Sequence, residues 1–425
     1  MSVFLIATLD TKGTEAAFVR DRLVELGVSV KVVDTGCIGE PTFAADVTRE
    51  QVFAAAGTSL DELLRKNDRG DAVTSAAAGV AKIIAEAHLA GEVNGVIGLG
   101  GSAGTTIGTS AMRTLPIGVP KLMVSTLASG QVRPYVGDKD ILMVNSVVDI
   151  AGINRISRVI LSQASAAMAG MVQHRIPDSI EDRQLIATTM FGVTTPCVQY
   201  ARQVLEDAGF EVLVFHATGN GGQAMESLIT DGLIAGVLDI TTTEIADELV
   251  GGILSAGPDR LTAAAKRGIP QVVSVGATDM VNFGSPDTVP EQFKHRKFYS
   301  HNPTVTLMRT TPEENVQIGT LIGRDVAASI GPAVIMLPLH GVSAIDRDGE
   351  PFDDPDAREN LFDAVRANHG NAQLIELENH INDAEFAVAA ATRLIELIRA
   401  KSNDGQHSII PFDCDLESVT KRRST

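Results

Sequence analysis

The segment that begins at Gly95, GVIGLGGSAGTTIG, spaces glycine and hydroxyl residues in a pattern that can bind an anion. An apolar run leads into it and a helical pattern follows. Glycine lets the backbone approach a bound group closely, and the first N–H groups of a helix attract negative charge. No lysine follows Gly104, so this is not a Walker A loop. We expect phosphate contacts from the cofactor-binding residues Gly98, Gly100, Gly101, Ser102, Gly104 and Thr105.

A second glycine loop lies in FHATGNGGQAME, where Gly219, Gly221 and Ala224 fit GxGxxA. Asp239 follows about 20 residues after the first glycine, which formally completes a dinucleotide fingerprint. The loop follows the second strand of its half and has a lengthened turn, so a phosphate or carboxylate loop is favoured over an NAD site. Cofactor contacts are expected from Thr218, Gly219, Gly221 and Gly222, with His216 at the edge as a catalytic candidate or a hydrogen-bonded strand-end histidine.

Further hydroxyl and carboxylate residues follow predicted strands, and ligands of open α/β sheets bind at the carboxyl ends of strands. Such residues can hold Mg²⁺ or simply cap helices. The expected cofactor-binding residues here are Thr8, Asp10, Thr11, Lys12 and Thr194. The expected catalytic residues, besides His216, are Asp239, Glu244, Asp279, His380 and Asp383. Asp10 and Asp239 are the candidate metal ligands.

Three cysteines, Cys37, Cys197 and Cys414, are an odd number and lie far apart. This pattern argues against a disulfide framework and favours a reducing cytosol. Cys197 follows Pro196 at a predicted helix start, where a lowered pKa could make the thiol a nucleophile. We favour the alternative, a small packed side chain.

Short apolar runs alternate with helical stretches along the whole chain, which predicts an α/β fold with mostly parallel sheets. In the first half, strands are expected at Val3–Leu9, Val28–Asp34, Gly95–Leu99, Lys121–Ser125 and Ile141–Val144. In the second half they are expected at Gln184–Met190, Glu211–His216, Gly236–Ile240, Gln271–Val275, Ala333–Leu337 and Gln373–Leu377.

The two halves resemble each other in sequence. LIAT occurs at 5–8 and again at 185–188, and GVPKLMVS from Gly118 parallels GIPQVVSV from Gly268. We expect two Rossmann-like three-layer subdomains related by apparent duplication. Their expected bounds are 1–180 and 181–401, joined near Pro177–Arg183, with a flexible tail at 402–425. The insertion 36–79 carries a capping-box pattern from Thr48 to Gln51 and is expected to act as a lid or binding loop.

The composition of the chain argues against two classes of binding partner, nucleic acids and membranes. The 425 residues carry 35 Lys and Arg against 53 Asp and Glu, a net charge of −18, and only 4% are aromatic. An acidic chain with few stacking side chains is not expected to bind nucleic acid. No apolar run is long enough to span a bilayer and the start lacks a basic leader, so no membrane is expected and the cytoplasm is the expected location.

Together the motifs resemble one family. GVIGLGGSAGT, LPIGVPKLMVSTLASGQ, SVVDIAGINRISRVILS, MFGVTTPCV, VFHATGNGGQAME, VLDITTTE and HINDAEFA are similar to the Tm-1-like ATP-binding domain family, named after a plant resistance protein against tomato mosaic virus. The similarity runs from Val3 to Arg399. It implies two Rossmann-like subdomains, ATP binding and a homodimer. The plant protein continues into a barrel domain, which implies a separate barrel-domain protein as a partner of this chain.

These observations lead to one expected function and two alternatives. The expected function is ATP binding, with Mg²⁺, in a cleft between the two subdomains, with the reaction undefined. The first alternative is a metal-assisted enzyme that acts on a small carboxylate or phosphorylated metabolite. The second is an NAD-dependent enzyme built on the second glycine loop. In each case the ligand is a small molecule.

Overall fold

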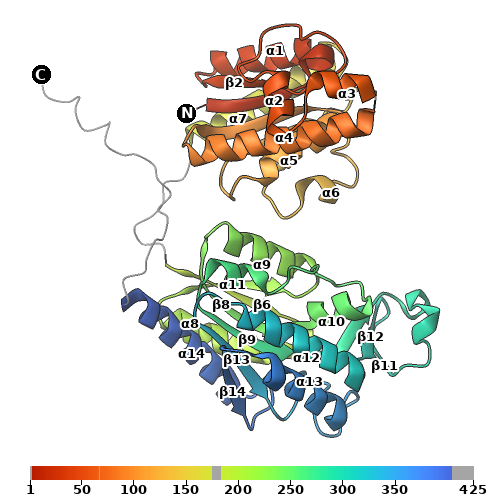
Figure 1. Ribbon diagram of the computed structural model, residues 1–425, viewed down its shortest axis with the longest axis vertical. Helices are drawn as coiled ribbons and strands as arrows, with labels where there is room; N and C mark the ends of the chain where they lie inside the picture. Colours follow the sequence, from red (N-terminus) through yellow and green to blue (C-terminus); the bar gives the residue numbers. More distant parts are fainter. Residues whose placement is uncertain (1, 67, 175–182, 404–425) are drawn as a thin grey trace, which may run out of the picture. The chain divides into compact units, whose positions relative to one another are not determined.

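The computed structural model describes residues 2–66, 68–174 and 183–403 (Figure 1). By contacts within the chain it divides into two units, Met1–Pro177 and Asp178–Thr425. The expected boundary near Pro177–Arg183 and the expected tail from 402 fall mainly outside the described residues.

The first unit is built on a parallel sheet of five strands in the order β2-β1-β3-β4-β5. Side chains of β1 alternate between its two faces, so Val3 and Leu5 enter one apolar cluster while Phe4 and Ile6 enter another. The strands are β1 Ser2–Ala7, β2 Val30–Asp34, β3 Val93–Gly100, β4 Lys121–Ser125 and β5 Leu142–Asn145.

Helices cover both faces of this sheet. One face is covered by α1 and α7, and the other by α2, α4 and α5. The expected capping box at Thr48 and Gln51 is confirmed at the start of α2. The helices are α1 Leu9–Glu25, α2 Arg49–Ala55, α3 Leu60–Lys66, α4 Arg69–Leu89, α5 Ser102–Arg113, α6 Arg133–Val136 and α7 Arg155–Gln173.

The second unit is built on a parallel sheet of six strands in the order β14-β13-β9-β8-β6-β7. When its strands are numbered along the chain, the order reads 2-1-3-4-5-6, which repeats the 2-1-3-4-5 order of the first unit. The strands are β6 Leu185–Met190, β7 Glu211–His216, β8 Ile234–Thr241, β9 Gln271–Gly276, β13 Ala333–Pro338 and β14 Gln373–Leu377.

Two helices, α8 and α14, pack on one face of this sheet. The other face is covered by α12 and α13 together with α9 and α11. The helices are α8 Thr195–Asp207, α9 Asn220–Thr230, α10 Thr243–Val250, α11 Thr262–Arg267, α12 Pro312–Ala327, α13 Pro355–Asn368 and α14 Ala384–Asn403. Short 3-10 turns are η1 Gly192–Thr194, η2 Pro286–Thr288 and η3 Glu291–Phe293.

A small antiparallel sheet in the second unit was not expected from the sequence. Its order is β10-β12-β11, and the strands are β10 Met280–Phe283, β11 Phe298–Asn302 and β12 Val305–Arg309. β10 begins only four residues after β9 ends, with Thr278 and Asp279 in the turn between them. The three antiparallel strands are only four or five residues long, too short for hydrophobic periodicity to identify them.

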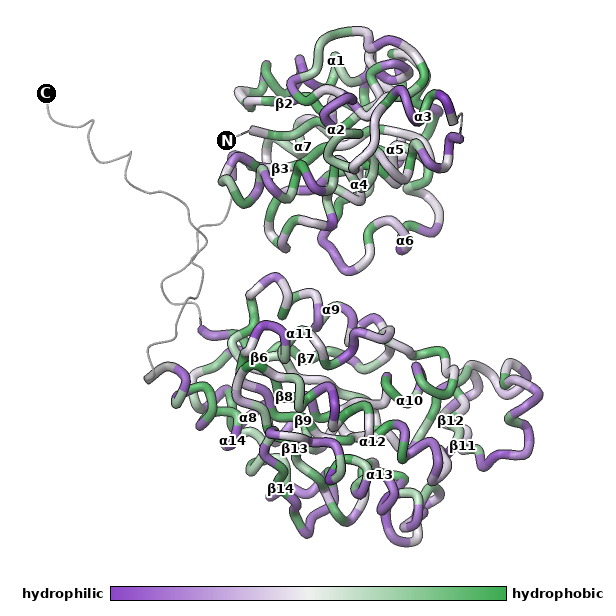
Figure 2. The backbone as a smooth tube through the Cα atoms, viewed as in Figure 1, coloured by the Kyte–Doolittle hydropathy of each residue, from purple (hydrophilic) through white to green (hydrophobic). Residues whose placement is uncertain are grey.

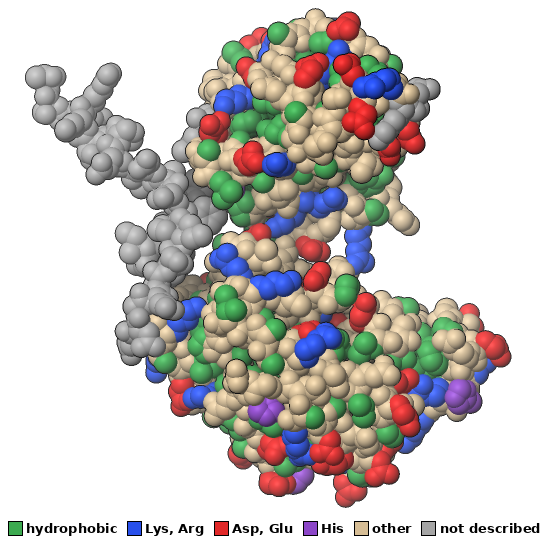
Figure 3. Space-filling view, viewed as in Figure 1, with side chains coloured by type: hydrophobic (Ala, Val, Ile, Leu, Met, Phe, Trp, Pro, Cys, Tyr) green, Lys and Arg blue, Asp and Glu red, His purple; other side chains and the backbone are tan. Residues whose placement is uncertain are grey.

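The expected fold class is confirmed: both units are α/β with parallel sheets. Figure 2 shows hydrophobic residues gathered along strands of the parallel sheets. On the face shown in Figure 3, acidic and basic side chains are interspersed. Within the described residues, no helix is long and apolar enough to cross a membrane.

Candidate functional site

The first unit has a topological switch point between β1 and β3. These strands are neighbours, with Ile6 opposite Gly98, and the helices that follow them, α1 and α5, cover opposite faces of the sheet. Ligands of open α/β sheets bind at such a point, outside the carboxyl ends of the strands. The loops there are the expected Thr8–Lys12 segment and the expected glycine loop.

Most glycines of the first loop have a packing reason. A Cβ on Gly98 would lie 2.7 Å from the Met123 sulfur, and one on Gly100 would lie 2.7 Å from the Cα of Gly104. Gly101 differs, because its added Cβ would meet only the Thr126 hydroxyl at 3.6 Å, an ordinary contact. Close packing therefore accounts for Gly98, against Met123 of β4, and for Gly100 and Gly104, where β3 meets α5, while a side chain at Gly101 would have ordinary space.

The first turn of α5 presents unpaired donors. Gly101 is the N-cap and supplies no side-chain cap, and the N–H groups of Ser102, Ala103 and Gly104 have no acceptor within the described part of the chain. Ser102 is exposed. Thr105 does not add a hydroxyl to this position, because it is buried and bonds to the Gly101 carbonyl at 2.8 Å and to the Ser125 hydroxyl at 2.6 Å.

The β1–α1 loop, taken here as Thr8 together with the first turn of α1, places two hydroxyls and a cation at the same edge of the sheet. The hydroxyls of Thr8 and Thr11 lie 2.7 Å apart, and the Lys12 ammonium donates to the Ile150 carbonyl. The backbone of Lys12 departs from helical geometry, with φ −127° and ψ 19°. The loop thus contributes hydrogen-bond donors beside the glycine loop.

Asp10 fastens the loop that follows β2. Its Oδ2 accepts from the N–H of Ile38 at 2.8 Å and from that of Gly39 at 3.2 Å, while its Oδ1 is buried without a partner. Asp34 accepts from the N–H groups of Leu9 and Gly36, and its burial raises the pKa of this carboxyl. The two carboxylates hold the β1–α1 loop and the start of the 36–79 insertion together.

The second glycine loop is closed by a carboxylate of the same chain. Oε1 of Glu244 accepts from the N–H of Gly219 at 2.7 Å and from that of Gly222 at 3.1 Å. A Cβ on Gly221 would lie 1.9 Å from the His216 carbonyl oxygen, so that glycine is required by backbone packing. Glu244 therefore holds the position at which an external anion was expected.

Asp239, expected as a catalytic residue and metal ligand, has both oxygens occupied. It forms a two-pronged ion pair with Arg260, at 2.5 and 2.8 Å, and accepts from the Thr189 hydroxyl at 2.6 Å. Arg260 also pairs with Glu244 at 2.8 Å and with Glu226 at 3.4 Å, and it is 3% exposed. Neither a ribose nor a metal ion can use Asp239 while this cluster is intact.

The switch point of the second unit, between β6 and β8, is also filled. The hydroxyls of Thr194 and Thr241 lie 2.8 Å apart and both residues are buried. His216 lies apart from this point, exposed at the end of the outer strand β7, with its ring 5.5 Å from that of Phe191. The Thr218 hydroxyl bonds to the His216 carbonyl at 3.3 Å.

Three of the expected catalytic residues are joined through Ser343, which the sequence did not single out. The Ser343 hydroxyl donates to Asp279 Oδ2 at 2.8 Å, and its carbonyl lies 2.8 Å from Nε2 of His380. The N–H of His380 donates to Asp383 at 2.8 Å. Burial raises the pKa of Asp279 to about 7, and Asp346 adds to the rise.

The tautomer of His380 follows from its partners. Nδ1 accepts from the N–H of Asn382 at 3.1 Å, so the ring proton is on Nε2 and is donated to the Ser343 carbonyl. Burial lowers the pKa of His380, which favours the neutral ring. The Asn382 side chain donates to the Val193 carbonyl at 2.9 Å and accepts from the N–H of Cys197 at 3.4 Å.

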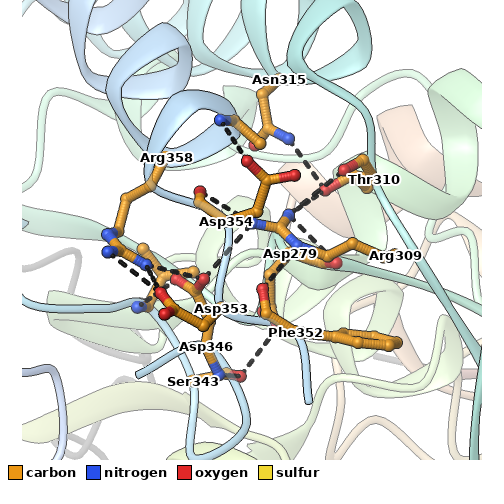
Figure 4. A network of polar contacts seen from close by, with 12 residues as sticks. Asp279, Arg309, Thr310, Asn315, Ser343, Asp346, Phe352, Asp353, Asp354 and Arg358 are labelled. Atoms are coloured by element: carbon orange, nitrogen blue, oxygen red, sulfur yellow. Dashed lines mark hydrogen bonds and ion pairs between the residues drawn. The ribbon is translucent and has the colours of Figure 1, made fainter. Parts of the chain in front are cut away.

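Figure 4 shows how this group continues into a larger buried network. Asp346 lies between Arg309, at 3.3 Å, and Arg358, at 2.9 Å. Arg309 also donates to the Phe352 carbonyl and to the Thr310 hydroxyl. The network ties the end of β12 to the loop after β13 and to α13, so its groups are largely paired with each other.

The contacts of the expected metal ligands and the burial of Cys197 bear on two further expectations. The described residues contain no group of three His, Cys, Asp or Glu side chains arranged to hold a metal ion. Of the two expected metal ligands, Asp10 keeps an oxygen without a partner and Asp239 does not. Cys197 is buried, and its burial raises the pKa of the thiol to about 12, which supports packing over a nucleophile.

The sequence did not single out Arg260, Ser343 and Asp346, which hold these clusters together. Each of them lies in a loop with other polar residues beside it, such as Asp259 next to Arg260, and its partners include residues of other elements. Arg260 is buried, and a buried arginine needs a buried acid. Spacing alone does not show which acid that is.

Two parallel α/β units, each with ligand-type loops at the carboxyl edge of its sheet, place the chain among two-domain Rossmann-like proteins. The chain belongs to the uncharacterised protein family UPF0261. Residues 1–177 match the N-terminal domain of that family and residues 183–398 match its C-terminal domain.

Its relatives agree with the resemblance seen in the motifs. The chain is 50% identical over 398 residues to a UPF0261 protein of Clostridium tetani, covering 93% of this chain and 98% of the relative. It is 41% identical over 418 residues to the ToMV resistance protein Tm-1(GCR237) of Solanum lycopersicum, covering 93% of this chain. The match spans 55% of the tomato protein, so that relative is considerably longer.

Among solved structures, the chain is similar to the UDP-N-acetylglucosamine 2-epimerase of Rickettsia bellii. The sequences are 10% identical, the alignment covers 95% of this chain and 98% of that one, and the TM-score is 0.23. At that score the similarity supports no conclusion about function.

Proposed function

We propose that the first unit binds the phosphate groups of a nucleotide at the N-terminus of α5. The observation that carries this proposal is the set of three N–H donors, on Ser102, Ala103 and Gly104, that have no acceptor in the described part of the chain. They lie at the switch point of the sheet, and the exposed Ser102 hydroxyl lies beside them. Donors of this kind stabilise phosphate oxygens.

Gly101 supports the same proposal. Gly98, Gly100 and Gly104 are required by close packing against neighbouring elements, but a side chain at 101 would have ordinary space. A glycine without a packing reason fits a position where a ligand approaches the backbone. Lys12, on the neighbouring loop, can exchange the Ile150 carbonyl for a phosphate oxygen.

ATP is the nucleotide we propose, because of the resemblance to the Tm-1-like ATP-binding domains. Magnesium would enter with the phosphates. Mg²⁺ is commonly bound through one or two carboxylates plus substrate phosphates, and Asp10 is the carboxylate at this edge that keeps an unpartnered oxygen. The ion would neutralise the phosphate charge beside the Asp10 carboxylate.

The test is calorimetric titration of the purified chain with ATP and Mg²⁺. Gly101→Val should abolish binding while the protein stays folded, because the branched side chain occupies the space of the phosphate. Gly170→Val is the matched control: Gly170 lies in α7 of the same unit, and its added Cβ would meet nothing within 4 Å. Equal affinity of the Gly101→Val variant and the wild type would contradict the proposal.

Chelation tests the role of magnesium. EDTA should weaken ATP binding strongly, and Asp10→Asn should weaken it in the presence of Mg²⁺. Equal affinity with and without EDTA would remove Mg²⁺ from the proposal and leave a site made of N–H donors and Lys12 alone.

An enzyme that acts on a small carboxylate or phosphorylated metabolite is the second candidate. The observation that favours it is Asp279, a buried acid with a pKa raised to about 7 and with one oxygen, Oδ1, that has no partner. Perturbed carboxyls of this kind are common at catalytic sites. The test is mass spectrometry of a metabolite extract incubated with wild type or with Asp279→Asn. A metabolite consumed by the wild type alone would favour this candidate.

A further inference from the structure

The second glycine loop already contains a carboxylate ligand. The loop joins β7 to α9, a helix of 11 residues, and its N–H groups at Gly219 and Gly222 both donate to the same oxygen of Glu244. Glu244 belongs to a different element, the first turn of α10, and is fully buried. Two backbone donors that converge on one oxygen at a helix N-terminus form the usual arrangement of an anion site.

A buried cation completes the arrangement. The other oxygen of Glu244 accepts from Nε of Arg260 at 2.8 Å, and Arg260 is held from its far side by Asp239. The loop is also shaped around the carboxylate, since a Cβ on Gly222 would lie 2.2 Å from Glu244 Oε2. Gly219 adopts φ +82°, a left-handed conformation that favours glycine.

We propose that the second glycine loop is an anion-binding loop whose ligand is the carboxylate of Glu244. Its ligand class is a small monocarboxylate, because two N–H groups and one guanidinium match the two oxygens of a single carboxylate. An external anion reaches the loop only when Glu244 is withdrawn. In the described part of the first unit no side chain accepts from the N–H groups at the start of α5, so one loop is open and the other is filled.

The proposal predicts chemical rescue by acetate. Glu244→Ala removes the γ-methylene and the carboxylate, and acetate carries the same number of carbons and oxygens. Acetate should raise the melting temperature of Glu244→Ala in a saturable way and leave that of the wild type unchanged, with chloride at equal ionic strength as the salt control. Absence of any acetate-specific rise in the folded variant would overturn the proposal.

Two control variants show whether stabilisation by acetate is specific to the site of Glu244. Glu244→Gln keeps an oxygen at the same reach and fills the space, so acetate should not stabilise it. Glu248→Ala removes an exposed glutamate from the same helix and should not respond either. A response of equal size in all three variants would mean that acetate acts generally, and it would contradict the proposal.

If Glu244→Ala does not fold, hydrogen exchange of the wild-type protein tests the proposal instead. The amides of Gly219 and Gly222 should exchange slowly, because both donate to a buried carboxylate. Exchange at the rate of exposed loop amides would overturn the proposal.

The number of ATP molecules bound per chain is a separate measurement. This experiment alone rests on the proposed function. Calorimetry should give one ATP per wild-type chain, since the second loop is filled. Two ATP per chain, both sensitive to mutation of their glycine loops, would overturn the inference. Acetate rescue without any ATP binding would instead support the inference and refute the proposed nucleotide site.

Discussion

The hydroxyl of Ser343 donates a hydrogen bond of 2.8 Å to Oδ2 of Asp279, and both residues are buried at the carboxyl edge of the second sheet. The other oxygen of Asp279 has no partner, and Asp346 nearby carries a second buried carboxyl. Burial and this neighbour raise the pKa of Asp279 to about 7, above the value of about 3.9 expected in the unfolded chain.

This relationship makes stability depend on pH. A raised pKa in the folded state stabilises the protein fully below about pH 4, and this stabilisation is lost as the pH rises toward 7. Asp279→Asn keeps an acceptor for Ser343 and cannot ionise. Its free energy of unfolding, relative to wild type, should rise by about 3 kcal/mol between pH 4.5 and pH 8. Urea unfolding at several pH values measures it; a constant difference would contradict the raised pKa.

Arg260 is expected to be essential to the fold of the second unit. Arg260→Met removes a buried cation and leaves Asp239 and Glu244 buried without it, which should cost about 3–5 kcal/mol of unfolding free energy. Arg366→Met is the control, because Arg366 pairs with three exposed or half-exposed acids. The control should cost about 1 kcal/mol or less. Equal costs in denaturant unfolding would show that the cluster is not structurally important.

The glycines of the first loop should differ in their tolerance of alanine. A Cβ at Gly100 would lie 2.7 Å from the Cα of Gly104, so Gly100→Ala must force β3 and α5 apart, at a cost of about 1–3 kcal/mol. Gly101→Ala should change stability by about 0.5 kcal/mol or less, because its Cβ finds ordinary space. Thermal and urea unfolding of the two variants, measured side by side, test this order. The reverse order would contradict the geometry of the loop.

Cys197 should behave as a packed side chain. Burial raises the pKa of its thiol to about 12, so it stays protonated at neutral pH. Cys197→Ala should cost about 1 kcal/mol of stability and leave ATP affinity unchanged. Mass spectrometry after iodoacetamide treatment of the native protein should find Cys197 unmodified, and modified after unfolding. Rapid labelling in the native state would show a reactive thiol instead.

Much of the fold could be predicted from the sequence because its signals are local. Buried parallel strands are continuous apolar runs, and strands such as Lys121–Ser125 and Glu211–His216 have the expected bounds. The capping box of Thr48 and Gln51 is a similar local signal. The antiparallel β10-β12-β11 sheet was missed, since its pairing joins Met280 to Arg309 across a long loop.

The sequence by itself determined two parallel α/β halves and the position of two glycine loops, because apolar runs and glycine clusters act over a few residues. Only the tertiary structure decided what each loop can do. The α5 donors beside Gly101 remain open, while the loop at Gly219 is filled by Glu244, from another helix, with Arg260 behind it. The two motifs look alike in sequence, since a buried charge is satisfied by whichever partner folding brings within hydrogen-bond distance, and sequence spacing does not specify that partner.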